Sequence, residues 1–281
     1  MRELAEYVLL GLIQGATEFL PVSSSAHLVA AGHILHVRTP GVVLGVCLHF
    51  GTLVAILIVL RREVWNLIRD TLRGMRLLLL GRRDAIDSEA PTFRIALAIV
   101  VGSIPAAVAG LGFYDAIEKA FESVQVTGVL LVVTGILLLV SRFAPQGKEV
   151  TVGPLKGFFI GLAQAAALLP GISRSGTTIV SACFLGIDRK LAARFSFLLA
   201  VPALGGAAAL EAAKMLNAGA ARQTLAQGEA VALGCGTATA AIVGSICLIL
   251  LLKVVQKGKL HWFGAYCVPL GIVLFALGSW M

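Results

Sequence analysis

Apolar runs long enough to cross a lipid bilayer alternate with short polar stretches along this chain. Six runs, each of about 17 to 25 mostly apolar residues, can span a hydrocarbon core of about 30 Å as a helix. These runs cover residues 42–60, 94–112, 125–141, 191–210, 231–252 and 262–280. The pattern therefore predicts an all-α integral membrane protein with six transmembrane helices.

Two further apolar segments are too short to cross the membrane. Residues 7–20 and 157–169 would reach only about 20 Å as helices, and each leads into a break that contains proline and serine. A second short apolar piece follows each break. We therefore expect two re-entrant helix-loop-helix hairpins, at 7–36 and 157–185, that turn near the middle of the membrane and leave on the side from which they entered.

The two hairpins resemble each other in sequence. Gly11-Leu-Ile-Gln14 aligns with Gly161-Leu-Ala-Gln164, and Ser23-Ser24-Ser25 aligns with Ser173-Arg174-Ser175, at a constant offset of 150 residues. Similarity that is concentrated on polar break residues is hard to obtain from the leucine and alanine content of apolar helices. The pattern therefore indicates an internal repeat.

Each half of this single membrane domain, residues 1–141 and 157–281, contains one hairpin followed by three spans. Because three is an odd number, the second half must be inverted relative to the first. Arginine and lysine in short loops stay on the cytoplasmic side. The stretch 61–94 holds eight arginines against five acids, whereas the loop 114–122 is acidic. The first hairpin is then expected to enter from outside and the second from the cytoplasm.

The composition agrees with a membrane protein and excludes several functions. Hydrophobic residues make up 58% of the chain and charged residues 14%, and the mean hydropathy is +0.93. The net charge of +8 resides in loops, where membrane orientation explains it, so we expect no nucleic-acid partner. The five cysteines are far apart in apolar stretches and are interpreted as small hydrophobic residues. We expect no removable signal peptide at the start of this sequence.

Polar and ionisable residues concentrate at the two hairpin tips. An ionisable side chain at the bilayer centre costs about 2.5 to 3.5 kcal/mol, so it requires a partner or a water-filled pocket. Gln14 and Glu18 share a helix face before the first break, His27 follows it, and Arg174 lies in the second break. An inverted repeat brings the tips together, so we expect Glu18 and His27 beside Arg174. His49 lies near a segment end and is interpreted as interfacial.

These groups favour an anion site with a base in it. The guanidinium of Arg174 suits phosphate oxygens, and a helix expected to start near Thr177 directs its positive end to the site. His27 lies three residues after Ser24 and can take the proton of its hydroxyl, while Glu18 can orient His27 or hold a divalent cation. The alternative is a buried ion-pair network of Glu18, His27 and Arg174 that only joins the hairpins.

Two long polar motifs carry a family resemblance. They are Gln14-Gly-Ala-Thr-Glu18-Phe-Leu-Pro-Val-Ser23-Ser24-Ser25-Ala26-His27 and Pro170-Gly-Ile-Ser173-Arg174-Ser175-Gly-Thr177-Thr178. At these motifs, and over essentially its whole length, the sequence resembles the bacterial undecaprenyl-diphosphate phosphatases of the bacitracin-resistance type. The resemblance implies hydrolysis of undecaprenyl diphosphate to undecaprenyl phosphate and inorganic phosphate. It also implies return of this lipid carrier to cell-wall synthesis and resistance to bacitracin.

The resemblance further implies a place in the bacterial cytoplasmic membrane and a pocket that opens to the outer face. It implies a divalent cation, Mg²⁺ or Ca²⁺, and a homodimer in contact with membrane lipids. Catalytic roles fall on Glu18, Ser24, His27 and Arg174. The candidate phosphate-binding set combines family positions with neighbouring hydroxyls, namely Gln14, Ser23, Ser25, Ser173, Arg174, Ser175 and Thr178.

The family has glutamate or glutamine where this sequence has Gln14. A neutral amide cannot serve as a second carboxylate, so we expect the cation to bind Glu18 and mainly the phosphates of the substrate. The family also leads us to expect a glycine before His27, where this sequence has Ala26.

The sequence leaves the nucleophile and one competing function open. A seryl-phosphate on Ser24, a phosphohistidine on His27 and direct attack by water activated at His27 or Glu18 use the same residues. The competing function is a flippase or secondary transporter for polyprenyl phosphates, because inverted repeats with broken helices are also the architecture of carriers. A carrier, however, has no use for Ser24 next to His27.

Overall fold

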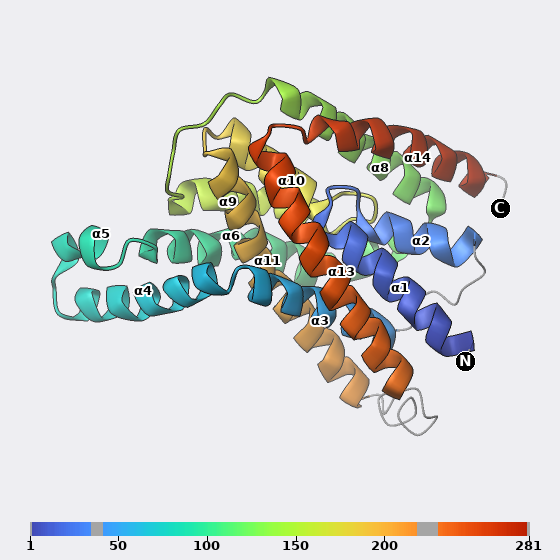
Figure 1. The fold of residues 1–281 in the computed structure, drawn as a ribbon, viewed down its shortest axis with the longest axis horizontal. Helices are drawn as coiled ribbons and strands as arrows, with labels where there is room; N and C mark the ends of the chain where they lie inside the picture. Colours follow the sequence, from blue (N-terminus) through green and yellow to red (C-terminus); the bar gives the residue numbers. More distant parts are fainter. Residues whose placement is uncertain (1, 35–41, 218–229, 280–281) are drawn as a thin grey trace.

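A computed structural model describes residues 2–34, 42–217 and 230–279 (Figure 1). Residues 35 and 36 of the first predicted hairpin and residue 280 of the last predicted span therefore lie outside the described part. The regular structure of the described residues is helical, apart from one isolated parallel bridge between Glu149 and Ile187. The helices are α1 (Arg2–Phe19), α2 (Ser24–Ile34), α3 (Val42–Val59), α4 (Arg61–Leu79), η1 (Arg83–Ala85), α5 (Ile86–Glu89), α6 (Phe93–Gly112), α7 (Tyr114–Phe121), α8 (Val124–Val140), η2 (Ser141–Phe143), α9 (Pro154–Ala166), α10 (Arg174–Phe184), α11 (Arg189–Asn217), α13 (Ala230–Gln256) and α14 (His261–Ser279).

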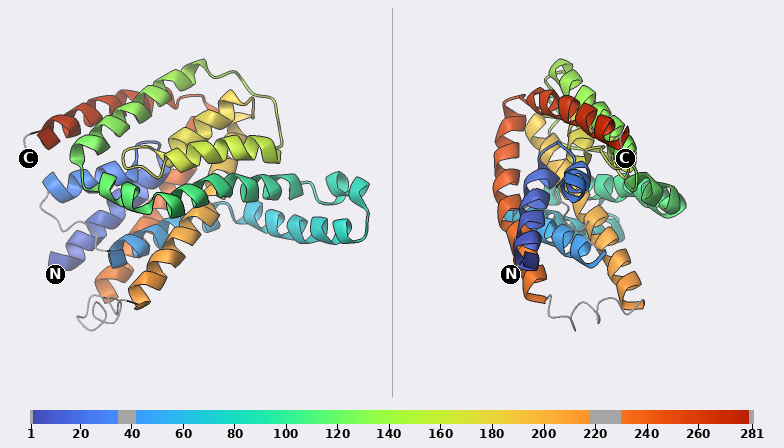
Figure 2. Two further views of the ribbon diagram at one scale, coloured as in Figure 1. Left: turned by 180° about the vertical axis from the view of Figure 1, so that it is seen from behind. Right: turned by 90° about the vertical axis from the view of Figure 1, so that its right-hand side faces the viewer.

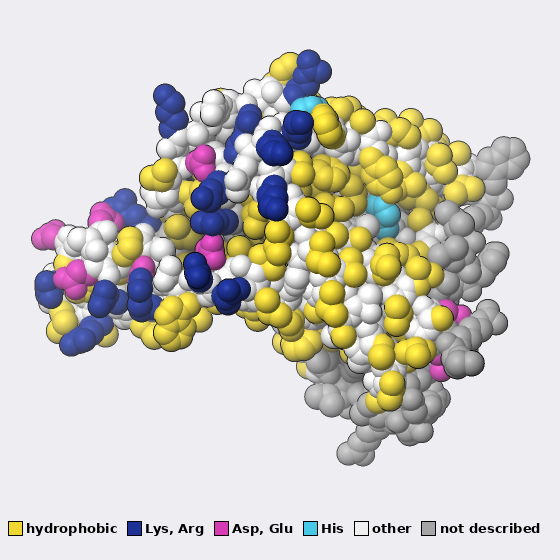
Figure 3. Space-filling view, viewed as in Figure 1, with side chains coloured by type: hydrophobic (Ala, Val, Ile, Leu, Met, Phe, Trp, Pro, Cys, Tyr) yellow, Lys and Arg dark blue, Asp and Glu magenta, His cyan; other side chains and the backbone are white. Residues whose placement is uncertain are grey.

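Each of the six predicted spans coincides with a helix. Within the described residues, α6, α8 with η2, α11, α13 and α14 supply five segments that are long and apolar enough to cross a membrane. The sixth span, α3, passes the same test only together with α4, from which it is bent by 80°. Large apolar side chains such as Val100, Leu111 and Ile242 stay exposed, and Figure 3 shows hydrophobic atoms over much of the body. These features fit a multi-pass membrane protein.

The arginine-rich stretch after α3 forms an arm and not an irregular loop. Figures 1 and 2 show α4 and α5 projecting from the body beside the start of α6. Asp70, Gly74 and Leu77 are the buried residues of α4, and their spacing of three to four residues places them on one helix face. The remaining faces carry the arginines, and Lys and Arg side chains gather over this end of the molecule in Figure 3.

Both short helix pairs break close to the predicted positions. The first pair breaks between Phe19 at the end of α1 and Ser24 at the start of α2, and the second between Ala166 of α9 and Arg174 of α10. Within the first break, Ser23 has a φ of +66°, and within the second, Gly171 has a φ of +95°. These left-handed residues reverse the chain in both breaks.

The starts of α1 and α10 differ from the sequence prediction. α1 begins at Arg2, five residues before the predicted apolar segment, because Arg2, Glu3 and Glu6 continue the helix with polar residues outside its apolar part. α10 begins at Arg174 and not near Thr177. The reason is its N-cap: the Ser173 hydroxyl accepts a hydrogen bond from the backbone N–H of Gly176 at 3.1 Å.

Helices from the two predicted halves pack in corresponding pairs. α1 packs against α13, and α9 packs against α6. Gly11 on α1 faces the backbone of Gly236, and Gly161, 150 residues later, faces the backbone of Gly102. A Cβ atom added at Gly11 would lie 3.0 Å from the Gly236 carbonyl carbon, and one added at Gly161 would lie 2.8 Å from that of Gly102. Small residues therefore let both pairs of backbones approach closely.

The last helix of each half completes this correspondence. α8 and α14 lie side by side, as Figure 2 shows, and they run in opposite directions. A Cβ atom added at Gly271 would lie 2.7 Å from the carbonyl oxygen of Gly128, and one added at Gly264 would lie 2.6 Å from that of Gly135. Each helix thus contributes two glycines seven residues apart, and each glycine faces one on the other helix.

Candidate active site

The two helix breaks meet inside the molecule. The Ser25 hydroxyl accepts a hydrogen bond from the backbone N–H of Gly171 at 3.2 Å, which links the first tip to the second. Thr134 on α8 holds the second tip from the other side. Its hydroxyl donates to the Gly171 carbonyl at 2.8 Å and accepts from the Ser173 N–H at 3.0 Å. The tips are therefore fixed by polar contacts between segments that are far apart in sequence.

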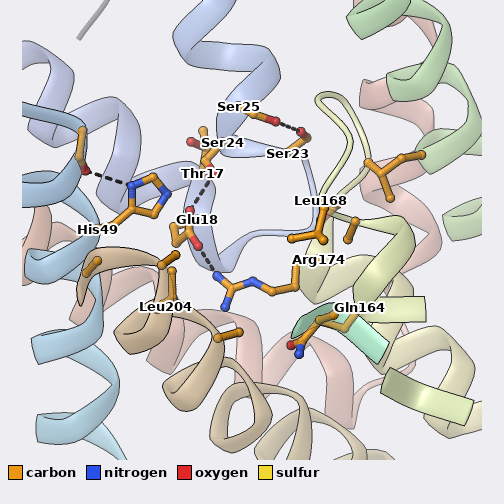
Figure 4. A pocket seen from close by; sticks show the side chains of 18 of the residues that line it. Thr17, Glu18, Ser23, Ser24, Ser25, His49, Gln164, Leu168, Arg174 and Leu204 are labelled. Carbon is orange, nitrogen blue, oxygen red and sulfur yellow. Dashed lines mark hydrogen bonds and ion pairs between the residues drawn. The ribbon is translucent and has the colours of Figure 1, made fainter. Parts of the chain in front are cut away.

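The Glu18 carboxylate is the centre of this polar contact region (Figure 4). One oxygen, Oε2, accepts hydrogen bonds from the Ser24 hydroxyl at 2.6 Å and from the Gln14 amide at 2.8 Å. The other oxygen, Oε1, pairs with Nη2 of Arg174 from the second tip. The predicted approach of the guanidinium to the carboxylate is confirmed, and both side chains are largely buried.

Ser23 in the first tip has a strained backbone conformation. A φ of +66° is unusual for a residue with a side chain, and such residues persist only where their surroundings determine them. The Ser23 hydroxyl lies 3.0 Å from that of Ser25, and its carbonyl accepts a hydrogen bond from Nδ1 of His27 at 2.8 Å. These contacts keep Ser24 and Ser25 at the start of α2, next to Glu18.

A cavity of about 540 Å³ opens beside these residues. Six of the predicted site residues line it: Glu18, Ser23, Ser24, Ser25, Ser173 and Arg174. Within the described residues, the buried Nη1 atom of Arg174 has no hydrogen-bond partner. The cavity wall therefore combines a guanidinium with a free donor, one carboxylate and four serine hydroxyls, a set suited to a phosphorylated ligand.

Three of the predicted phosphate-binding residues do not line the cavity. The Thr178 hydroxyl lies 2.5 Å from that of Ser196 on α11 and donates to the Arg174 carbonyl at 2.7 Å. Ser175 is buried with its hydroxyl 3.3 Å from that of Ser173, and Gln14 is buried behind Glu18. Thr178 does not reach the cavity because α10 starts early and turns the Thr178 hydroxyl toward α11.

The position predicted for His27 was also wrong. Its ring does not line the cavity beside Arg174 but stacks on Tyr266 of α14, with centroids 5.7 Å apart. Since a carbonyl only accepts, Nδ1–H donates to Ser23, and Nε2 lies 2.7 Å from the Tyr266 hydroxyl. When the ring is neutral, Nε2 accepts a hydrogen bond from the Tyr266 hydroxyl. Both ring nitrogens are therefore occupied away from Ser24.

The histidine that does line the cavity is His49 on α3. Figure 4 shows its ring on the Glu18 side, and Nδ1–H donates to the carbonyl of Gly45 at 2.9 Å. Sequence reasoning interpreted His49 as interfacial. Its position seven residues after the start of the predicted span 42–60 could have identified it, because an ionisable side chain inside an apolar span requires a polar environment.

A second cavity of about 690 Å³ adjoins the first. Both are lined by Ala106 of α6, by Leu168, and by Ala203 and Ala207 of α11. The rest of the second lining is mostly apolar and comes from α6, α7 and α11. The first cavity, called the polar chamber because the polar side chains of the helix breaks form part of its wall, therefore adjoins a second, apolar chamber.

The metal-ligating side chains at the tips form only a weak metal site by themselves. Within the described residues, no group of three or more histidine, cysteine, aspartate and glutamate side chains is arranged to hold a metal ion. At the tips, the Glu18 carboxylate lines the cavity and can act as a metal ligand, whereas the Oε1 atom of Gln14 is buried away from the cavity. One carboxylate fits a divalent cation that takes its other ligands from phosphate oxygens and water.

Comparison with known proteins agrees with the geometry of the site. The family model described as bacitracin resistance protein BacA matches residues 7–273. An undecaprenyl-diphosphatase of Desulfosudis oleivorans is 43% identical over 273 residues, which cover 96% of this chain and 97% of the relative. An undecaprenyl-diphosphatase of Desulforapulum autotrophicum is 38% identical over 98% of this chain and 99% of the relative. The chain therefore belongs to the family of bacitracin resistance protein BacA.

Proposed function

We propose that this chain is an undecaprenyl-diphosphate phosphatase, which hydrolyses undecaprenyl diphosphate to undecaprenyl phosphate and inorganic phosphate. One observation carries the proposal: Ser24 donates to Glu18, and Arg174 pairs with the same carboxylate, at the wall of a cavity of about 540 Å³. The names of the relatives, which align over nearly their whole length, support the same activity. The reaction returns the lipid carrier to the synthesis of peptidoglycan and other cell-wall polymers, and it accounts for bacitracin resistance.

The two adjoining cavities suit the two parts of this substrate. The polar chamber offers Arg174 and serine hydroxyls to the diphosphate. The apolar chamber between α6, α7 and α11 offers carbon side chains to the first isoprene units. A ligand with a charged head and a long apolar chain can therefore place its head at the helix breaks while its chain leaves toward the lipid.

The contacts of Ser24 support it as the nucleophile. Its Oγ attacks the terminal phosphorus and forms a new P–O bond, while the bond to the bridging oxygen breaks and undecaprenyl phosphate leaves with the electron pair. The proton of Ser24 passes to Glu18, with which the hydroxyl already forms a 2.6 Å hydrogen bond. Nη1 of Arg174 stabilises the charge that builds on the phosphoryl oxygens.

Water completes the cycle. It attacks the seryl-phosphate, releases inorganic phosphate and restores the Ser24 hydroxyl, so the net reaction consumes one water molecule. A phosphohistidine on His27 is disfavoured because both nitrogens of this ring already have hydrogen-bond partners. Glu18 lies beside the cavity and can take a proton from either Ser24 or water.

A divalent cation, Mg²⁺ or Ca²⁺, belongs to the proposal. Glu18, which lines the cavity, would hold it together with phosphate oxygens of the substrate. When bound, the cation neutralises part of the diphosphate charge.

The helix arrangement supports an inverted repeat with two re-entrant hairpins, over 1–141 and 157–281. Exchange of the two halves converts the α1–α13 pair into the α9–α6 pair and leaves the α8–α14 pair unchanged. The antiparallel contact of α8 with α14 is what a twofold axis in the membrane plane produces. Each short helix pair turns at a tip that meets the other tip, as hairpins from opposite sides would do.

Contacts between basic loops support an orientation in the bacterial cytoplasmic membrane. Arg194 pairs with Glu63 at 3.1 Å, Lys156 donates to the Leu185 carbonyl at 2.8 Å, and the backbone at Gly258 lies against the Arg189 guanidinium. The basic segments around α4, α9, α11 and α13 thus meet at one end of the molecule. The rule that positive loops stay inside places this end in the cytoplasm, with the active site opening to the outer face. The homodimer remains a proposal from the family resemblance.

A flippase or secondary transporter for polyprenyl phosphates is the weaker candidate function. Transport of a phosphorylated lipid requires a cation such as Arg174 but not a hydroxyl that is hydrogen-bonded to a carboxylate. Release of inorganic phosphate from undecaprenyl diphosphate is expected of a phosphatase and not of a transporter.

The test is phosphate release from detergent-solubilised protein given undecaprenyl diphosphate, with Mg²⁺ or with a chelator. Ser24→Ala should lower the rate by about 10³-fold or more, and the chelator should slow the wild type. Ser245→Ala is the matched control, because this hydroxyl on α13 only donates to the Ala241 carbonyl one turn earlier. Wild-type rates in Ser24→Ala would refute the nucleophile, and absence of phosphate release from the wild type would refute the function.

A further inference from the structure

Gln164 on α9 is a buried polar side chain that the proposed mechanism does not use. It lines the polar cavity with Arg174 and is only 2% exposed. Neither its Nε2 nor its Oε1 has a hydrogen-bond partner within the described residues. An amide buried without partners is costly, so the position requires an explanation in terms of what it binds.

The repeat supplies an internal comparison for this residue. Gln14 occupies the corresponding position of the first half, and its Nε2 donates to Glu18 four residues later. The position four residues after Gln164 is Leu168, which also lines the cavity but cannot form hydrogen bonds. The second half therefore keeps the amide and lacks the carboxylate that would bind it, so the amide of Gln164 is free for a ligand.

The neighbouring groups define the chemistry of that ligand. Figure 4 shows Gln164 and Arg174 on the same side of the cavity, and Nη1 of Arg174 is the other buried donor there without a partner. Two donors, one of them charged, suit the oxygens of a phosphate. The Oε1 atom of Gln164 requires a donor, which the water around a phosphate supplies.

We propose that Gln164 is a substrate-binding residue: its Nε2–H donates to an oxygen of the phosphate that Nη1 of Arg174 also binds. This inference rests on the proposed phosphatase function for the identity of the natural ligand. It does not depend on which residue is the nucleophile, because it concerns only how the phosphate is held.

The test compares Gln164→Met with Gln164→Asn and with Gln14→Met in the full-length protein in detergent. Methionine keeps the length and nearly the volume of glutamine but removes both polar atoms, and asparagine keeps the amide but withdraws it from the cavity. Melting temperatures are measured without ligand and with inorganic pyrophosphate, and KM is measured with undecaprenyl diphosphate. Gln14→Met is the comparison at the repeat position, where the amide is already bound to Glu18.

We expect Gln164→Met to melt without ligand at or above the wild-type temperature, because it removes no hydrogen bond within the described structure. It should lose most of the pyrophosphate-induced shift and raise KM about tenfold or more, the effect of one hydrogen bond to a charged group. Gln164→Asn should also weaken binding. Gln14→Met should melt at a lower temperature without ligand, since it breaks the bond to Glu18.

A Gln164→Met protein that melts below wild type while its pyrophosphate shift and KM are unchanged would overturn the proposal and make Gln164 a structural residue. If Gln164→Met does not fold, Gln164→Asn decides by the same two readouts. The two proposals fail in different ways. If the phosphatase function is wrong, the wild type releases no phosphate, and the pyrophosphate-induced shifts in melting temperature still decide the role of Gln164.

Discussion

Arg174 and Glu18 are 156 residues apart in sequence and form a buried ion pair between the tips of two broken helix pairs. Removal of either partner leaves an uncompensated charge in a buried site, so the pair joins the two tips. In the proposed mechanism the pair is also more than a structural contact. Nη1 of Arg174 remains without a partner within the described residues, so the guanidinium can bind the carboxylate and a phosphate at once.

Replacement of this arginine should therefore affect turnover more than folding. Arg174→Ala is expected to lower kcat by about 10²- to 10³-fold, the usual effect of one lost donor to a charged transition state. The amount of folded protein should fall much less, because Glu18 can be protonated and keeps hydrogen bonds from Ser24 and Gln14. Phosphate release per folded molecule, with folding followed by size-exclusion chromatography, measures both effects.

Arg94→Ala is the control for this prediction. Arg94 carries the same charge but is exposed, and it pairs with Asp87 outside the cavity at 2.8 Å. Its replacement should leave kcat unchanged. Normal turnover in folded Arg174→Ala protein would contradict the assigned role.

His27 and Tyr266 should act as one unit that supports Ser23. Tyr266→Phe removes only the hydroxyl that lies 2.7 Å from Nε2 of His27, and a lost hydrogen bond of this kind costs about 0.5–1.5 kcal/mol. We expect a loss of activity of about three- to tenfold. His27→Ala should lose more, since it also removes the contact to the Ser23 carbonyl.

The double variant distinguishes support from chemistry. If His27 only positions the first tip, adding Tyr266→Phe to His27→Ala should cause no further loss. A different result, in which His27→Ala is inactive and Tyr266→Phe has full activity, would show that His27 takes a proton in the reaction as the sequence first indicated.

The helices and the meeting of the tips were predictable from the sequence. Apolar runs are long and separated by charged loops, so the six spans follow from hydropathy. The approach of Arg174 to Glu18 followed from an inverted repeat with polar breaks, because such a repeat brings corresponding breaks to the same depth. Neither step depends on the rotation of a single side chain.

The side-chain directions around the site were not predictable. Successive helical residues point about 100° apart, so an error of one residue in a helix start changes which side chains face the cavity. α10 starts three residues earlier than expected, and Thr178 contacts Ser196 as a result. The partner of His27, Tyr266, is 239 residues away, and no local pattern connects the two.

Stability at low pH should depend on Asp70, which lies on α4 outside the apolar body. Burial alone would raise the pKa of Asp70, but hydrogen bonds from Arg69 and Thr92 outweigh burial and hold the pKa below its ordinary value of 3.8. Because the pKa is lower in the folded state, the stabilisation is fully present above about pH 4 and is lost as the pH falls through the folded-state pKa.

Asp70→Asn should therefore destabilise the protein by about 1–3 kcal/mol at pH 7 and by less at pH 3. Thermal unfolding in detergent at both pH values measures the difference. Asp87→Asn is the control, since the Asp87–Arg94 pair is exposed and should contribute about 0–1 kcal/mol. An equal difference between wild type and Asp70→Asn at both pH values would rule out this role for the carboxylate.

Corresponding glycines in the two halves should be equally intolerant of a side chain. Gly11→Ala places a methyl group against the backbone of Gly236, and Gly161→Ala places one against the backbone of Gly102. Neither contact can be relieved by a side-chain rotation, so the helices must separate, and we expect each variant to lose about 1–3 kcal/mol of stability in thermal unfolding.

Gly205→Ala on α11 is the control, because nothing lies within 4 Å of its added Cβ. It should be neutral or stabilising by up to about 1 kcal/mol through helix propensity. If Gly11→Ala were as stable as Gly205→Ala, the close α1–α13 contact would be refuted, and with it the correspondence between the two halves.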